Sequence, residues 1–268
     1  MTRRALCAIA LAACALLASG CARLAPAGGQ PALHIAADET SAPLAGSLLN
    51  GYESLHAGAL LTLSPMSREE ALAAVRSGAA DAALLLHPPD GTSLFHTPVA
   101  RDSLVIVAHP DIPYESLSRR DVRAIFAGQV TTWPAVNEQP RQPIQVVATE
   151  ETSSVRVAFD ALVLQGQPVT GSARLAPTAA DMVALTMATP GTISVAALST
   201  LDGQSRILAY EGHTAPPHGT TRGTYPLITP VVLVTQEEPE DALRSLLDWI
   251  LSAEGQEIVR RHMLAVND

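Results

Sequence analysis

Short apolar runs alternate with amphipathic segments along most of the chain. The runs are brief and rich in β-branched or small residues, as expected for strands that are buried on both faces of a parallel sheet. They lie at residues 33–37, 82–86, 103–108, 144–148 and 230–235. Amphipathic helical segments begin at or near Ser41, Ser67, Ser118, Ser153, Thr178, Pro239 and Ser252. Strands that alternate with helices in this way predict an α/β fold with mostly parallel sheets.

Capping residues mark the ends of several predicted helices. Ser67 has a glutamate three residues later, which is the capping-box pattern, and Gly78 provides a left-handed end to the same helix. Ser118 and Gly128 bracket a second helix, in which apolar residues recur at spacings of three and four. Ser41 is expected to cap the first helix, because a proline follows it within the first turn.

The segment after the run at residues 144–148 is the best candidate for an anion site. A helix is expected to begin at Ser153 and Ser154, and Arg156 falls in its first turn. Free backbone amides, hydroxyls and a cation would then lie together, which is the arrangement that binds anions. The alternative is a plain capping serine followed by a surface arginine, because capping serines need no ligand.

The sequence around this segment resembles that of a known family. The residues that carry the resemblance are Leu117, Ile125, Phe126, Gly128, Trp133, Pro143, Ile144, Ser153, Arg156 and Phe159. In this order and spacing they resemble the phosphate-type substrate-binding proteins of ABC importers. The resemblance implies a type II periplasmic-binding-protein-like fold, in which two mostly parallel sheets flanked by helices form two lobes with a cleft between them.

The resemblance also implies how the chain is divided. Residues 1–20 would be a signal peptide, and residues 21–31, rich in alanine, proline and glycine, would be a tether. The first lobe would combine residues 32–108 with residues 224–268. The second lobe would comprise residues 109–223, so that the chain crosses between the lobes near each end of that range.

The expected ligand is a small oxyanion or a related polar solute, held in the cleft by residues near two helix starts. The expected contacts are Thr40, Ser41, Ser153, Ser154 and Arg156. The match to the family is incomplete here, because Thr149 replaces an arginine that grips the ligand, and Glu39 falls where a hydroxyl is expected. Leu86 likewise replaces a polar residue. Loss of a bidentate cation and gain of a carboxylate both disfavour tight binding of a phosphate dianion.

The charge of the chain narrows the choice of partners. All 17 cationic side chains are arginines, and the formal net charge is −9 at neutral pH. An acidic surface disfavours nucleic acid and anionic membrane surfaces as partners, although local amides can still hold a small anion. We expect a monomer that delivers its solute to an ABC permease.

The N-terminal residues read as a targeting segment. Arg3 and Arg4 precede an apolar run over residues 5–17, which is too short for a membrane span and ends in Ala-Ser-Gly before Cys21. This ending resembles a bacterial lipobox, which predicts cleavage before Cys21 and lipid attachment to its sulfur. The other two cysteines lie inside the segment that would be removed. The alternative is an ordinary signal peptide followed by an incidental cysteine.

No catalytic or cofactor motif is apparent. His213 and His218 could ligate a metal, but only Glu211 is nearby and no cysteine completes a site, so we expect no metal and no cofactor. The sequence has no glycine-rich phosphate loop and no nucleophile elbow, so an enzyme is not expected. The second hypothesis is a non-transporting sensor or interaction lipoprotein that keeps the fold but has a degenerate pocket; a hydrolase is the third.

Overall fold

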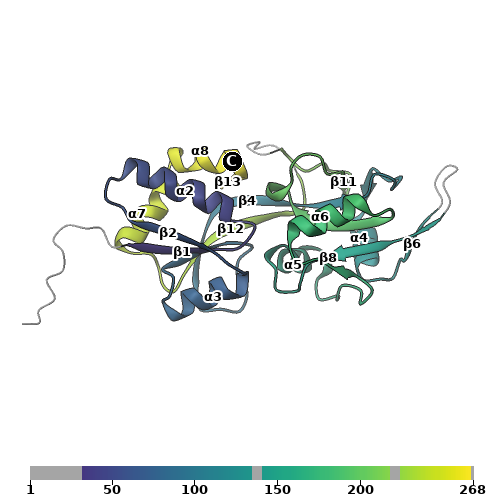
Figure 1. Cartoon of the computed structure of the whole chain (residues 1–268), viewed down its shortest axis with the longest axis horizontal. Helices are drawn as coiled ribbons and strands as arrows, with labels where there is room; N and C mark the ends of the chain where they lie inside the picture. The colour runs from purple at the N-terminus through teal and green to yellow at the C-terminus, as the bar shows by residue number, and fades with distance from the viewer. Residues whose placement is uncertain (1–31, 135–140, 218–223, 267–268) are drawn as a thin grey trace, which may run out of the picture. The chain divides into compact units, whose positions relative to one another are not determined.

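The computed structural model describes residues 32–134, 141–217 and 224–266 (Figure 1). The strands are β1 Leu33–Ala37, β2 Leu61–Pro65, β3 Ala82–Leu86, β4 Phe95–Ala108, β5 Ser116–Leu117, β6 Thr132–Trp133, β7 Gln142–Pro143, β8 Gln145–Ala148, β9 Arg174–Leu175, β10 Thr192–Ala197, β11 Ile207–Tyr210, β12 Ile228–Thr235 and β13 Leu264–Ala265. The helices are α2 Ala42–Leu55, α3 Arg68–Ser77, α4 Arg119–Phe126, α5 Ser154–Phe159, the π-helical turn η1 Asp160–Leu164, α6 Ala179–Ala188, the 3-10 turn η2 Leu198–Thr200, α7 Asp241–Ile250 and α8 Ala253–His262. Each helix within these three ranges is too short or too polar to span a membrane.

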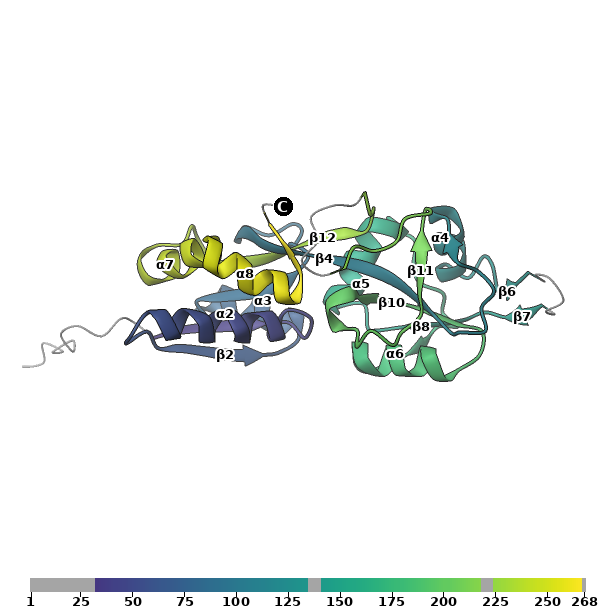
Figure 2. The same ribbon diagram turned by 90° about the horizontal axis from the view of Figure 1, so that it is seen from above.

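The described residues form one compact unit whose elements gather in two groups (Figures 1 and 2). In the first group the strand order is β2-β1-β3-β12-β4. Helices α2, α7 and α8 cover one face of these strands, and α3 covers the other. In the second group the order continues as β4-β10-β8-β9, with α4, α5 and α6 around the strands.

The long strand β4 belongs to both groups. It pairs with β12 from Phe95 to Ser103 and with β10 from Leu104 to Ala108 (Figure 2). Residues 104–108, which the sequence placed in the first lobe, therefore hydrogen-bond to strands of the second group. Buried apolar side chains along β4 connect the cores of the two groups.

The sheets are mixed, which corrects the expectation of mostly parallel strands. The pairs β1–β2, β1–β3, β10–β8 and β8–β9 are parallel, and each belongs to a stretch in which strands alternate with helices. Strand β4 follows β3 without an intervening helix, and both β4 and β12 pair antiparallel to their main neighbours. The alternation of strands and helices predicts parallel pairing, but it does not hold at β4 and β12, where the chain passes directly between the two groups.

Most of the predicted caps are confirmed. The side chain of Ser67 accepts a hydrogen bond from the third residue of α3 in a complete capping box, and Gly78 ends that helix with a φ of 73°. Ser118 and Ser153 also cap α4 and α5, because each side chain accepts a hydrogen bond from the backbone amide of the third residue of its helix. Ser41 is the exception, because its side chain makes no capping hydrogen bond to α2.

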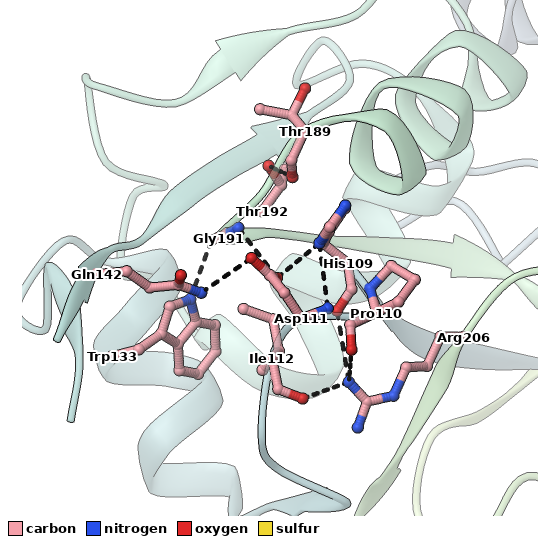
Figure 3. Close-up of polar contacts among 10 residues, drawn as sticks. All are labelled: His109, Pro110, Asp111, Ile112, Trp133, Gln142, Thr189, Gly191, Thr192 and Arg206. Atoms are coloured by element: carbon pink, nitrogen blue, oxygen red, sulfur yellow. Dashed lines mark hydrogen bonds and ion pairs between the residues drawn. The ribbon is translucent and has the colours of Figure 1, made fainter. Parts of the chain in front are cut away.

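The connection that follows β4 is held by one guanidinium. Arg206 donates hydrogen bonds to the carbonyl oxygens of His109 (3.4 Å) and Pro110 (3.3 Å) and to that of Ile112 (Figure 3). It also donates to the carbonyl oxygen of Tyr114 at 2.9 Å. Carbonyl groups that a turning loop leaves unpaired are thereby satisfied without a sheet partner.

The same connection is tied to the loop before β10. Asp111 forms an ion pair with His109 at 2.6 Å, and it accepts hydrogen bonds from the Gly191 amide at 3.3 Å and from Gln142 at 3.4 Å (Figure 3). The Trp133 indole nitrogen donates to the Gly191 carbonyl at 3.0 Å. Trp133 therefore anchors its loop.

Candidate ligand-binding site

A cavity of about 140 Å³ lies where the two groups of elements meet. Its lining comes from the β1–α2 connection, the start of α3, the β8–α5 connection and the start of α6. The lining residues are Asp38, Glu39, Thr40, Ser67, Arg68, Thr149, Glu150, Thr152, Ser153, Ser154, Val155, Pro177 and Ala179. Both β1 and β8 end here, and the carboxyl ends of strands are where α/β folds bind their ligands.

Three of the five predicted contact residues line this cavity. Thr40 comes from the first group, and Ser153 and Ser154 come from the second. The Ser153 hydroxyl is shared between Thr149, at 2.5 Å, and the capping hydrogen bond to α5. Ser154 is buried, and its hydroxyl donates to the Asp38 carboxylate.

The other two predicted contacts are placed elsewhere. Ser41 is fully buried beneath the start of α2, and within the described part of the chain its hydroxyl has no hydrogen-bond partner. The Arg156 guanidinium donates to Asp160 at 2.8 Å and lies 3.7 Å from Glu151. Asp160 is one helical turn after Arg156, and Arg156 does not line the cavity. Arg156 is therefore not the counter-charge in the cavity that we expected.

The cation that does line the cavity is Arg68, at the first position of α3. Its side chain is 6% exposed, and it donates to the carbonyl oxygens of Leu86 (2.8 Å), His87 (2.9 Å) and Pro88 (3.2 Å). Burial lowers the pKa of Arg68, and the nearby Asp38 opposes that shift. The guanidinium thus closes the end of β3 and has already used several of its donors on backbone carbonyls.

Asp38, directly after β1, is the polar residue that sequence reasoning missed. Its carboxyl group is 2% exposed and accepts hydrogen bonds from the backbone amides of Ser41 (2.7 Å) and Leu86 (2.8 Å), and from the hydroxyl of Ser154. Burial raises the pKa of Asp38, and these hydrogen bonds oppose the shift. Its position between a strand and a predicted helix start was the available signal, but the sequence alone did not show which donors it meets.

A second buried acid lies on β4 at the point where that strand changes partners. One carboxylate oxygen of Asp102 accepts from the Ser103 amide at 2.7 Å, and the other accepts from the Ser199 hydroxyl at 2.5 Å. Burial raises the pKa of Asp102 to about 7; its hydrogen bonds to Ser199 and Ser103 lower that pKa, and the nearby charge of Asp38 raises it. Asp102 does not line the cavity, so it marks the connection between the groups rather than the binding site.

Acidic groups predominate at the cavity. Asp38, Glu39 and Glu150 line it, and Arg68 is the one cation among the described lining residues. No cluster of three metal-ligating side chains occurs in the described ranges, and His218 lies outside them. The arrangement offers hydroxyl donors and carboxyl acceptors to a small polar molecule.

Comparison with known proteins places the chain in a family. A family model described as a PBP superfamily domain matches residues 24–254. A phosphate-binding protein, PstS 2, from Streptococcus agalactiae is 27% identical over 129 residues, a match that spans 44% of this chain and 44% of that protein. The chain thus aligns with less than half the length of this curated relative.

Two solved structures share the fold. One is a phosphate ABC transporter substrate-binding protein with bound phosphate from Clostridium perfringens, with a TM-score of 0.78 and 20% identity over 88% of this chain and 100% of that one. The other is an ABC-type phosphate transport receptor from Vibrio cholerae, with a TM-score of 0.74 and 18% identity over 87% and 99%. These likenesses confirm the expected two-lobe α/β fold. The family match over most of its length shows that the chain belongs to the PBP superfamily.

Proposed function

We propose that this protein is the solute-binding component of an ABC importer and that it binds a small polar solute in the cavity between its two groups of elements. The observation that carries the proposal is the convergence of Thr40, from the first group, and Ser153, from the second, on one cavity at the ends of β1 and β8. A ligand held from both sides would stabilise the closed arrangement of the two groups. The names of the relatives suggest an oxyanion as the solute.

The proposed location is extracytoplasmic, with the protein held at the membrane by lipid on Cys21. Cys21 lies outside the described residues, so this part of the proposal rests on the lipobox-like ending and on the family. Substitution Cys21→Ser should release the protein from the membrane fraction into the soluble fraction. Retention of the variant in the membrane fraction would contradict the anchor.

A panel of solutes tests the binding function directly. Thermal unfolding of the wild-type protein would be measured with phosphate, sulfate, molybdate, organic phosphates, polyols and small amines. A solute present at a hundred times its dissociation constant stabilises the folded state by about 2.7 kcal/mol. Thr40→Val and Ser153→Ala should weaken the response to that solute, whereas Thr62→Val, on β2 and outside the cavity, should leave it unchanged.

The second candidate is a sensor or interaction lipoprotein that keeps the fold without transporting a solute. The observation that favours it is the state of the two charged groups in the cavity, because Asp38 and Arg68 are both buried and both bound to the protein itself. A panel without any response, together with unchanged stability in Thr40→Val, would favour this candidate. A solute that binds would favour the importer component.

A further inference from the structure

Three hydrogen-bond donors from separate elements converge beside the cavity. They are the Ser41 amide before α2, the Leu86 amide at the end of β3 and the Ser154 hydroxyl at the start of α5, and we refer to them as the anion cradle. Two belong to the first group of elements and one belongs to the second. Two amides and a hydroxyl directed at one point form the kind of site that holds an oxyanion.

The Asp38 carboxyl group accepts from all three donors. One oxygen accepts from Ser41, and the other accepts from both Leu86 and Ser154. Capping of α2 accounts only for the Ser41 contact, because a cap satisfies amides of its own helix. The caps Ser67 and Ser118 make no contact of comparable reach, since each bonds within its own first turn.

We propose that Asp38 is a built-in occupant of the anion cradle, so that the wild-type protein does not bind free oxyanions there. A phosphate or carboxylate would have to displace a carboxyl group that is covalently attached and therefore present at a very high effective concentration. It would also approach Glu39 and Glu150, whose carboxylates line the same cavity. Arg68 compensates only in part, because three of its five N–H donors are bonded to backbone carbonyls.

This inference narrows the class of ligand for the proposed function. It rests on that function in one respect, which is that the cavity is the ligand site. With the cradle filled, the polar residues that remain beside Arg68 for a solute carry hydroxyl or carboxyl groups: Glu39, Thr40, Ser67, Thr149, Glu150, Thr152 and Ser153. Such a lining favours an uncharged or cationic solute that donates hydrogen bonds, such as a polyol or a small amine. Asp38 is thus the residue that determines specificity against anions.

Removal of the carboxyl group should open the cradle to a free anion. Formate matches the group that Asp38→Ala deletes, so the test is a formate titration against chloride at constant ionic strength. Asp38→Ala should show a saturable rise in Tm on the order of 5 °C at saturating formate. The wild type should not respond to formate or phosphate. Asp38→Asn should not respond either, because its carboxamide still fills the cradle without the charge.

Each outcome decides the inference separately from the proposed function. A saturable response of the wild type to phosphate or formate would overturn the inference while the solute-binding function survived. A response of Asp38→Ala to formate, with a wild type that binds no solute of any class, would support the inference and remove the function. An Asp38→Ala variant that ignores formate would also overturn the inference.

A folding defect in Asp38→Ala would not prevent the test. The variant would then be refolded from denaturant in formate and, in parallel, in chloride. Recovery of soluble, cooperatively unfolding protein in formate alone would show that a free carboxylate replaces the Asp38 group. Equal failure in both salts would overturn the proposal.

Discussion

Replacement of Asp102 by asparagine should remove the part of the pH dependence of stability that this buried carboxyl group contributes. The carboxyl group is 1% exposed on β4 and meets the Ser103 amide and the Ser199 hydroxyl. Burial raises the pKa of Asp102 from 3.8 to about 7. Because the pKa is higher in the folded state, the contribution of Asp102 to stability is complete below the unfolded pKa and is lost as the pH rises through the folded pKa.

The size of the effect follows from the pKa difference. Each unit corresponds to about 1.4 kcal/mol, so stability should fall by about 3 kcal/mol through this group between about pH 5 and pH 8. Asparagine resembles the neutral acid, because its carboxamide oxygen can accept from the Ser103 amide while its nitrogen donates to the Ser199 hydroxyl. The variant should therefore be close to the wild type at low pH and more stable than the wild type at high pH.

Urea unfolding of both proteins at the two pH values measures this difference. Titrating groups that do not interact with Asp102 are present in both proteins and cancel in the comparison. Asp202→Asn, on an exposed turn after η2, is the matched control and should give the same difference from the wild type at both pH values. A difference between Asp102→Asn and the wild type that does not change with pH would refute the reasoning.

Three further substitutions and one control test contacts within the fold, each by urea unfolding. Arg68→Ala should cost about 3 kcal/mol, because it leaves three backbone carbonyls without their charged donor; stability within error of the wild type would contradict the assigned role. Gly191→Ala should cost more than about 2 kcal/mol, since its φ is 78° and the added Cβ would lie 2.5 Å from the Pro143 carbonyl oxygen. Gly203→Ala, with a similar φ and open space around it, should cost only about 1 kcal/mol, and equal losses would refute the steric argument. Trp133→Phe should cost about 1 kcal/mol through the lost bond to the Gly191 carbonyl, and no loss would show that ring packing alone anchors the loop.

Features fixed by neighbouring residues could be predicted from the sequence. The capping box of α3, the serine cap of α4 and the left-handed helix end at Gly78 depend on side chains and amides within a few residues of each other, and they formed as expected. The contact of Arg156 could also have been predicted from neighbouring residues, because Asp160 lies four residues later and competes with any ligand for the guanidinium. The family pattern predicts Arg156 at the ligand, but it takes no account of Asp160.

The candidate site could not be predicted in the same way, because its contacts join distant parts of the chain. Asp38 meets Leu86 at a separation of 48 residues and Ser154 at a separation of 116. Arg68 reaches carbonyls 18 to 20 residues away, and no pattern of side chains reports where a backbone carbonyl points. Thr40 and Ser153 were found because the family places hydroxyls near both helix starts. The acid that occupies the cradle was not found, because it departs from that pattern.

The two buried acids together bear on how this protein would respond to a solute. Asp38 accepts a hydrogen bond from the Ser154 hydroxyl, and Asp102 accepts one from the Ser199 hydroxyl. In each case the acid belongs to the first group and the serine to the second. A solute changes a conformational equilibrium only by its difference in affinity for the two states. Contacts that already hold the groups together without a solute favour the closed state before binding, so a smaller share of the molecules changes conformation when a solute binds. An importer component of this design would therefore show a small conformational change on binding, and the same contacts would suit a constitutively closed interaction module.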